Sequence, residues 1–282
     1  TAATKDKYQK FAADVASALA ERKIKAPVYI LKADGGTLPL DRSVGMPVET
    51  IFSGPAASIM GVLALTEPGQ TSVVVDIGGT TTDLALILSG QPLLSSKGAR
   101  VDSLLTHVRA FAVKSVAIGG DSAVAFNGSS LTVGPHRDGP PMCLGGGMPT
   151  PTDALRVLGL SSIGDGARAE QAMQILGNGL GCSAAEAAQK TVDAVVERMV
   201  SEIEEMFREW ESEPAYRIWE IMSKEKLSAQ NVVGVGGGSP PLVPLVAERL
   251  GAAAVVPEHA PVANAIGAAV AGEKALAVMK HV

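Results

Sequence analysis

Cysteine is scarce in this 282-residue chain, which contains only Cys143 and Cys182. Two cysteines so far apart provide neither a secreted disulfide framework nor the C-x-x-C spacing of a metal or redox site. Cys143 has no neighbouring histidine, so we expect a packed thiol rather than a nucleophile. The four histidines also lack metal-ligand spacing. The cytoplasm is therefore the expected compartment.

Long apolar runs and a strong charge of one sign are missing as well. Asp76 ends the apolar VVV run and Asn264 interrupts the last alanine-rich stretch, so we expect no membrane span. The net charge is −5, with no dense basic run, which argues against binding to nucleic acid or anionic membranes. The chain begins at Thr1 without a methionine or a leader, which is typical of a fragment or a processed chain.

Apolar residues nevertheless make up 46% of the chain, enough for a large core and one or two domains. Short apolar runs alternate with helical patterns and glycine turns, which predicts an α/β protein with a mixed sheet and flanking helices. The expected helices cover 4–22, 53–65, 152–158, 183–210, 240–250 and 261–279. The expected strands cover 26–31, 73–76, 83–88, 131–133, 231–235 and 253–256.

Several of these helices have recognisable start signals. Ser53 and Ser239 are expected N-caps, each followed closely by a proline in the first helical turn. The SAAE sequence at 183–186 is a capping box. Between 116 and 151, glycine and proline are so frequent that we expect irregular loops, either an insertion or the lining of a site.

A pattern of strand, glycine turn and small-residue helix occurs twice, at 28–65 and at 232–272. Only the second copy is preceded by a glycine-threonine hairpin, so a duplicated protein would place a further hairpin before Thr1. The alternative is that this pattern recurs in every α/β protein. Both interpretations remain open from the residues alone.

The hairpin itself reads Asp76-Ile-Gly-Gly-Thr-Thr-Thr-Asp83. Its glycines remove side-chain obstruction, and its hydroxyls add donors, which is suited to cradling a phosphate. It is neither a Walker loop nor a Rossmann fingerprint. Asp76 could hold Mg²⁺ through water or orient an attacking group. An ordinary hairpin, with Asp76 accepting from turn N–H groups, is the alternative.

A second glycine loop, Gly236-Gly237-Gly238, joins a strand to a helix N-terminus. Backbone there can lie flat against a nucleotide, and the helix dipole favours anions. A tight strand-to-helix turn is an equally good interpretation. The GGDS sequence at 119–122 is either another polar contact or, as we favour, a plain loop.

An ordered set of segments resembles the central hydantoinase A domain of the hydantoinase/oxoprolinase family, across nearly the whole length. ADGG with SGPAASIMG is similar to the family's S-D-G-G and S-G-P-A-x-G-x-x-G elements. DIGGTTTD resembles D-M-G-G-T-S-T-D, and VGPHRDGPPMCLGGGMPTPTDALRVLG resembles its V-G-P, P-G-P-x-C-Y-G-x-G-G and T-x-T-D-A stretches. GVGGGSPPLVP resembles its nucleotide-side ending.

The resemblance implies the fold of the actin, sugar-kinase and heat-shock-chaperone ATPases, in which two ribonuclease-H-like lobes enclose ATP. Residues 1–68 would be the end of the first lobe, and 69–282 the second, with an insertion at about 119–228. The implied cofactors are ATP and Mg²⁺. The implied second phosphate loop and adenosine loop are Gly78, Gly79, Thr80, Thr81 and Gly236, Gly237, Gly238, with Asp76 as catalytic and metal-binding residue.

The implied activity is ATP-dependent opening of a C–N bond in a small cyclic amide such as 5-oxoproline or a hydantoin, or in relatives the activation of a ketone for carboxylation. The first phosphate loop would belong to an upstream lobe or a partner subunit, and a homo-oligomer is a further expectation. An ATP-driven chaperone or reactivating factor, and a non-catalytic nucleotide-binding remnant, are the alternatives.

The chain departs from the family pattern in three places. GGDS stands where a glycine triplet often precedes serine, Leu144 replaces a tyrosine, and His136 and Asp138 add charge to a stretch that usually has less. A shifted substrate is therefore an open alternative.

Overall fold

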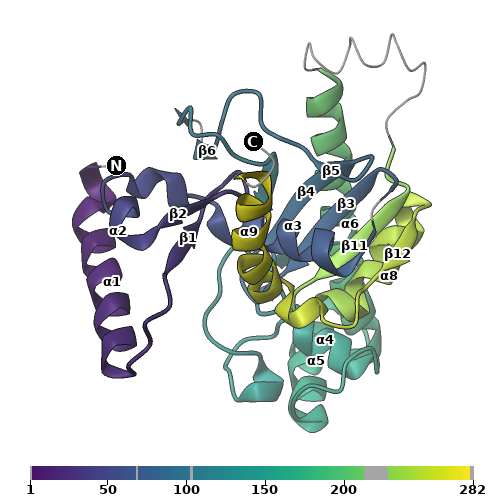
Figure 1. Ribbon diagram of the computed structural model, residues 1–282. Helices are drawn as coiled ribbons and strands as arrows, with labels where there is room; N and C mark the ends of the chain where they lie inside the picture. The colour runs from purple at the N-terminus through teal and green to yellow at the C-terminus, as the bar shows by residue number, and fades with distance from the viewer. Residues whose placement is uncertain (1, 68, 102–103, 213–227, 280–282) are drawn as a thin grey trace. The chain divides into compact units, whose positions relative to one another are not determined.

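The computed structural model describes residues 2–67, 69–101, 104–212 and 228–279, which form two compact units (Figure 1). The first comprises Thr1–Glu67, Gly90–Val113 and Val262–Val282, and the second Pro68–Ser89 and Lys114–Pro261. The predicted lobes, 1–68 and 69–282 with an insertion at about 119–228, remain a prediction. The packing units differ from them in grouping 90–113 and 262–282 with the N-terminal residues.

The first unit is built mainly of helices and short strands. Its helices are α1 (Ala2–Glu21), α2 (Leu40–Ser43), the 3₁₀ helix η1 (Pro47–Thr50), α3 (Ser53–Leu65) and α9 (Ala263–Met279). Its strands are β1 (Tyr29–Leu31), β2 (Thr37–Pro39), β5 (Gln91–Pro92), β6 (Arg100–Val101) and β7 (Leu104–Leu105). β1 and β2 form an antiparallel hairpin around the predicted Asp-Gly-Gly turn.

Helices α3 and α9, which belong to the two copies of the sequence repeat, pack against each other along their length (Figure 1). Their glycines permit this approach. A β-carbon at Gly61 would stand 2.0 Å from the carbonyl oxygen of Ala263, and one at Gly267 would stand 1.8 Å from that of Ala57. The small residues of α9 were expected to allow close packing on a sheet. The principal partner is instead a helix.

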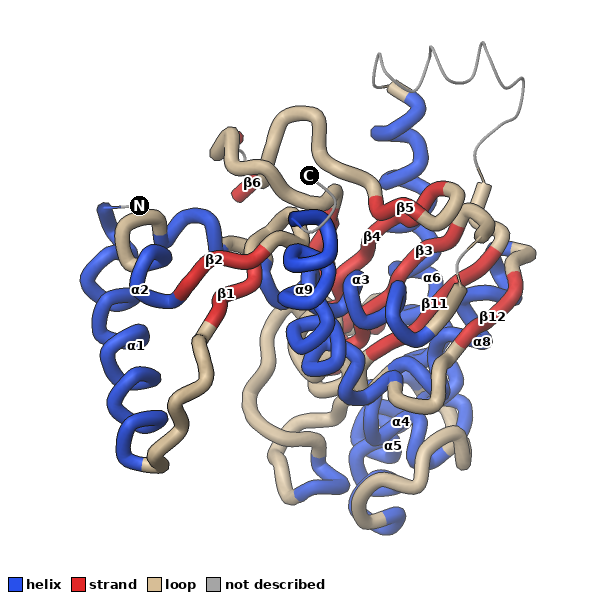
Figure 2. Tube along the Cα trace, in the orientation of Figure 1, coloured by secondary structure: helices blue, strands red, loops and turns tan. Residues whose placement is uncertain are grey.

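The second unit contains a mixed sheet with the strand order β12-β11-β3-β4 (Figure 2), and β8 also pairs with β4. These strands are β3 (Ser72–Ile77), β4 (Thr82–Leu88), β8 (Val113–Val116), β11 (Asn231–Val235) and β12 (Ala253–Val255). β3 and β4 form the predicted antiparallel hairpin, whereas β11 runs parallel to both β3 and β12. The predicted α/β class with a mixed sheet is confirmed.

Helices complete the second unit. They are α4 (Pro151–Val157), α5 (Gly166–Leu180), α6 (Ala184–Glu211), α8 (Ser239–Leu250) and the 3₁₀ helices η2 (Met142–Leu144) and η3 (Ala260–Val262). β9 (Val124–Phe126) and β10 (Leu131–Val133) form a separate antiparallel hairpin. α8 packs on β11 and β12. In the described part of the chain, no helix is long and apolar enough to cross a membrane.

The capping predictions had mixed outcomes. Ser183 and Glu186 form the predicted capping box of α6, and the apolar stripe of this helix from Val192 to Ile203 is buried. The N-caps of α3 and α8 were predicted one residue too late. They are Phe52, whose backbone is left-handed, and Gly238, so both serines already lie inside their helices. Helix α5 was not predicted, although Asp165 caps its start.

Candidate functional site

The two glycine loops singled out in the sequence lie side by side in the second unit. β3 and β11 are parallel neighbours, with Val235 opposite Asp76, so the loops that follow them leave the same edge of the sheet. The N–H of Gly238 donates to the carbonyl of Ile77 at 3.1 Å. The placement of loops at the carboxyl ends of adjacent parallel strands is where ligands bind in open α/β sheets.

Gly236 brings the second loop directly against Asp76. Its φ is +82°, and a β-carbon there would stand 2.6 Å from Oδ1 of Asp76 and 2.6 Å from the carbonyl oxygen of Ile77. A β-carbon at Gly238 would stand 2.6 Å from Cγ2 of Ile77. Gly237 differs, because no atom lies within 4 Å of its β-carbon position. The first and third glycines therefore fit the loop to β3, while the middle one presents bare backbone to open space.

The hairpin turn between β3 and β4 keeps part of its backbone available. The N–H of Gly78 donates to the carbonyl of Thr81 at 3.0 Å, which closes the turn. No hydrogen bond among the described residues uses the N–H of Gly79 or Thr80. Thr80 and Thr81 are exposed. Exposed N–H groups and hydroxyls on a glycine turn are the donors that an anion needs.

The GGDS sequence, which we favoured as a plain loop, packs onto this hairpin. The N–H groups of Gly120 and Asp121 donate to the carbonyls of Gly78 and Gly79 at 2.9 and 2.7 Å. A β-carbon at Gly119 would stand 2.5 Å from the carbonyl oxygen of Gly79. The loop is thus a third wall of the site. Gly119 is needed for its close approach to the hairpin, and Gly120 for its contact with Thr152.

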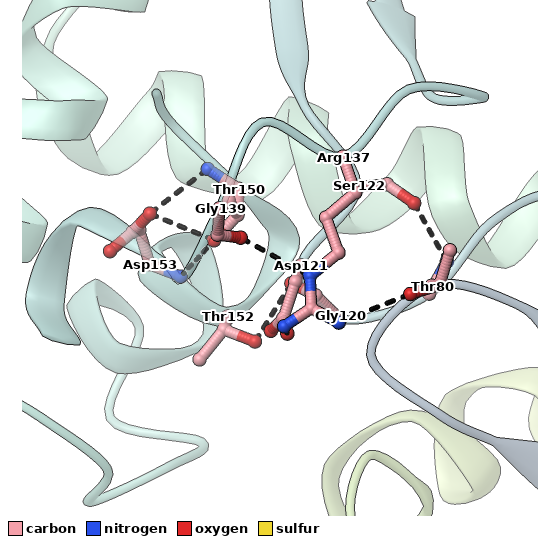
Figure 3. Close-up of polar contacts among 10 residues, drawn as sticks. Thr80, Gly120, Asp121, Ser122, Arg137, Gly139, Thr150, Thr152 and Asp153 are labelled. Atoms are coloured by element: carbon pink, nitrogen blue, oxygen red, sulfur yellow. Dashed lines mark hydrogen bonds and ion pairs between the residues drawn. The ribbon is translucent and has the colours of Figure 1, made fainter. Parts of the chain in front are cut away.

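Arg137 connects the third wall to the hairpin (Figure 3). Its Nη2 lies 2.7 Å from Oδ2 of Asp121, and its Nη1 donates to the hydroxyl of Thr80 at 3.2 Å. Its Nε donates to the carbonyl of Gly139 at 3.2 Å. Burial raises the pKa of Asp121, and the positive charge of Arg137 opposes that rise. The pair places a cation beside the tip of the hairpin.

The first turn of α4 holds the GGDS loop through Thr152 and is itself fixed by a buried carboxylate. Asp153, fully buried in the first turn of α4, accepts hydrogen bonds from Cys143 N–H at 2.7 Å and from Thr150 N–H and hydroxyl at 2.9 and 2.8 Å. The next residue on the same turn, Thr152, donates from its N–H and its hydroxyl to Gly120. The start of α4 therefore fixes the position of the GGDS loop.

Asp76 and Asp83 lie opposite each other at the base of the hairpin. Burial raises the pKa of Asp83, and the negative charge of Asp76 raises it further, while the Ser115 hydroxyl, which donates at 2.5 Å, lowers it. Mg²⁺ is usually held by one or two carboxylates, waters and substrate phosphates. This acidic pair fits that donor set. Among the described residues no group of three or more His, Cys, Asp or Glu could hold a metal, so the phosphates would have to contribute.

The structure thus places the predicted residues Asp76, Gly78, Gly79, Thr80 and Thr81 next to Gly236, Gly237 and Gly238. What these residues bind stays a prediction. Sequence reasoning missed Asp121 and Arg137 as members of the site. The available signals were the departure of GGDS from the family pattern and the extra charge noted at His136 and Asp138, which flank Arg137.

The chain belongs to the hydantoinase/oxoprolinase family, because the sequence model of Hydantoinase/oxoprolinase matches residues 1–275. This confirms the resemblance inferred from the motifs.

Individual relatives agree with this assignment. The acetophenone carboxylase gamma subunit of Aromatoleum aromaticum is 36% identical over 119 residues, which cover 39% of this chain and 16% of that protein. The structure is similar to that of nucleotide-free acetone carboxylase, with a TM-score of 0.72, 23% identity and coverage of 92% of this chain and 37% of that one. It is also similar to the ATP-dependent caprolactamase of Pseudomonas jessenii, with a TM-score of 0.66, 25% identity and coverage of 93% and 39%. The chain therefore spans about two fifths of these solved relatives.

Proposed function

We propose that the second unit binds Mg-ATP and contributes one face of the active site of an ATP-dependent hydrolase that opens a C–N bond of a small cyclic amide. The observation that carries the proposal is the contact between the two glycine loops, in which Gly236 lies against Asp76. The parallel pairing of β3 and β11 brings both loops to one sheet edge, and a nucleotide site requires both of them there.

Each part of the site has a role in this proposal. The N–H groups of Gly79 and Thr80 and the threonine hydroxyls would donate to phosphate oxygens. The bare backbone at Gly237 would lie against the base or ribose. Asp76 and Asp83 would hold Mg²⁺ through water. The metal would neutralise charge that develops on the phosphates.

The bond-breaking chemistry follows from phosphoryl transfer. Transfer of the terminal phosphoryl group of ATP to the amide carbonyl oxygen would release ADP and make the carbonyl carbon more electrophilic. Water would then add to that carbon, the C–N bond would break as the nitrogen takes up a proton, and hydrolysis of the resulting acyl phosphate would give the ring-opened carboxylate and phosphate. The name of the Pseudomonas jessenii relative, an ATP-dependent caprolactamase, supports a cyclic amide as the substrate class.

A second candidate function is the activation of a ketone for carboxylation. The 36% identity to the acetophenone carboxylase subunit and the TM-score of 0.72 to acetone carboxylase favour it. The same face of the site would serve, because a ketone, in its enolate form, also offers an oxygen to the transferred phosphoryl group. The two candidates differ only in the group bound beside the phosphates.

A chaperone role has less support. The apolar stripe of the long helix α6 packs within its own unit, against α4, α5 and α8, and so is not left open to a partner. The relatives described above are enzymes by name.

We further propose that the other face of the nucleotide cleft comes from sequence or a subunit outside these 282 residues. The chain spans 37% and 39% of its solved relatives, and its described residues contain one glycine-threonine hairpin. A phosphoryl group that is being transferred is stabilised by hydrogen-bond donors on both sides of the cleft.

The test is ATP turnover by the native protein, with any subunits that copurify with it. Release of phosphate is measured with 5-oxoproline, hydantoin and caprolactam, and with acetone and acetophenone in the presence of bicarbonate. Stimulation by a cyclic amide, with ring-opened product, supports the main proposal. Stimulation confined to ketone plus bicarbonate supports the second. No Mg-ATP binding by calorimetry would overturn both.

A further inference from the structure

We propose that Arg137 binds the terminal phosphate of the nucleotide, and that Asp121 holds its guanidinium in position when that phosphate is absent. The inference rests on the proposed function, because it assumes that the hairpin is the phosphate loop. It deepens that function by assigning a residue that distinguishes ATP from ADP.

The first step is the direction of the bound nucleotide. The loop at 236–238 contacts the β3 end of the hairpin, at Asp76 and Ile77. Arg137 and Asp121 contact the opposite part of the turn, at Thr80 and Gly79. With the nucleoside on the loop at 236–238, the phosphate chain would cross the hairpin and end beside Arg137.

The second step is the state of the guanidinium. The Arg137 side chain is 42% exposed, yet three of its nitrogens are held by acceptors from three different segments: the carboxylate of Asp121, the hydroxyl of Thr80 and the carbonyl of Gly139 (Figure 3). Arginine is always charged and binds phosphate through its planar fork. A fork already fixed at the tip of a phosphate loop loses little freedom when it binds there.

The third step is the role of Asp121. A β-carbon at Gly79 would stand 2.5 Å from Oδ2 of Asp121, so this carboxylate lies directly over the turn. An unpaired carboxylate in that place would repel a phosphate. In the free protein Arg137 neutralises this carboxylate, and an arriving phosphate competes with Asp121 for the same guanidinium.

The Arg137–Asp121 pair should therefore respond differently to a nucleoside triphosphate and to a nucleoside diphosphate. A triphosphate reaches Arg137 and exchanges with Asp121. A diphosphate is one phosphate shorter, so the Arg137–Asp121 pair stays closed.

The experiment is calorimetry on the complete native protein with Mg²⁺ and either a non-hydrolysable ATP analogue or ADP. The variants are Arg137→Ala, Arg137→Lys and Asp121→Asn. Arg249→Ala is the matched control, because Arg249 is similarly exposed and ion-paired, to Asp193, but lies on α8 away from the hairpin. Thermal unfolding is recorded for every variant.

We expect Arg137→Ala to lower the affinity for the ATP analogue at least about tenfold, while the affinity for ADP changes less than about threefold. Arg137→Lys should lose part of the affinity for the ATP analogue, because lysine keeps the positive charge but lacks the planar guanidinium fork. If the Arg137→Ala protein unfolds, the Arg137→Lys protein takes its place in the comparison. Asp121→Asn should keep or raise analogue affinity, because it removes the competitor. Arg249→Ala should match the wild type.

Three results would overturn the inference alone: equal weakening of both ligands by Arg137→Ala, no weakening of either, or a loss in Asp121→Asn as large as in Arg137→Ala, which would make the pair purely structural. If the wild-type protein binds neither ligand, the proposed function itself fails. The two failures are therefore distinguishable.

Discussion

Gly236 and Asp76 are 160 positions apart in the sequence, yet a β-carbon on Gly236 would lie 2.6 Å from the Asp76 carboxylate. This contact defines the geometry of the candidate site, because it fixes the second glycine loop against the strand that carries the hairpin. It also divides the three glycines by role. Gly236 and Gly238 are constrained by the fold, whereas no described atom lies within 4 Å of the β-carbon position of Gly237.

Replacing Gly237 with valine should therefore block the nucleotide without destabilising the protein. No atom lies within 4 Å of the β-carbon position, so a side chain has room in the free protein. It would occupy the space that the base or ribose needs. We expect an unchanged melting temperature and a loss of Mg-ATP affinity of at least about tenfold, roughly 1.4 kcal/mol, by calorimetry.

Gly236→Ala is the contrasting variant. Its β-carbon would meet Asp76 and Ile77, and its φ of +82° is unfavourable for alanine, so it should melt at a lower temperature. Normal ATP binding by a normally folded Gly237→Val protein would return the loop to its interpretation as a tight turn.

Thr80→Val should weaken Mg-ATP binding with little loss of stability. The hydroxyl of Thr80 is exposed and accepts from Arg137 at 3.2 Å. A hydrogen bond to a charged group is typically worth about 1.5 to 3 kcal/mol, so affinity should fall at least about tenfold. Thr80→Ser keeps the hydroxyl and should bind like the wild type. Equal affinities for all three proteins would identify the turn as structural only.

The sequence predicted the local structure at the candidate site better than the packing around it. The hairpin at 76–83 and the loop at 236–238 carry local signals, because glycine patterns and strand alternation act over a few residues. The packing of GGDS on the hairpin depends on contacts between positions about 40 apart, which no local pattern encodes. Arg137 was hidden for the same reason, since its partner Asp121 lies 16 residues away in a glycine-rich loop.

The cap errors have a different, local cause. Ser53 and Ser239 are good capping residues, but the chain before α3 turns through a left-handed Phe52, and Ser239 donates to the carbonyl of Gly236 at 2.8 Å. Backbone geometry that the residue types do not specify therefore placed the start of each helix one residue earlier. The Ser183 and Glu186 capping box of α6 is confirmed.

Asp153→Ala should be strongly destabilising. The carboxylate is fully buried, and its removal leaves the N–H groups of Cys143 and Thr150 without their acceptor. Buried unsatisfied donors cost about 1 to 3 kcal/mol each, so the free energy of unfolding in urea should fall by about 3 to 5 kcal/mol.

Asp165→Ala provides the comparison, because Asp165 is an exposed N-cap that accepts from Ala167 and Arg168. It should lose only about 1 kcal/mol. A loss of that size in Asp153→Ala would contradict the anchoring role assigned to the start of α4.

Cys143 should resist alkylation in the native protein. Burial, followed by the nearby Asp153 carboxylate, raises the pKa of the Cys143 thiol from 9.0 to about 12. The reactive thiolate is therefore absent near pH 8. Peptide mapping after iodoacetamide treatment should find label on the half-buried Cys182 in the native protein. Cys143 should be labelled only after unfolding. Because the native thiol holds its proton more tightly, its contribution to stability is complete below about pH 9 and is lost as pH rises toward 12. Native labelling of Cys143 at the rate of Cys182 would contradict this.

Gly61→Ala should destabilise the packing of α3 against α9. The added β-carbon would stand 2.0 Å from the carbonyl oxygen of Ala263, which is backbone and has no rotamer to move away. The two helices must then separate, and overpacking of this kind costs about 1 to 3 kcal/mol.

The matched control is Gly54→Ala, in the first turn of the same helix, where no atom lies within 4 Å of the β-carbon. There alanine is the better helix former and should leave the protein equally stable or stabilise it by up to about 1 kcal/mol. Urea unfolding of both variants separates the two effects, because helix propensity favours alanine at both positions and only the contact with α9 opposes it at Gly61. Equal stabilities for the two variants would show that α3 and α9 do not approach each other as closely as their glycines allow.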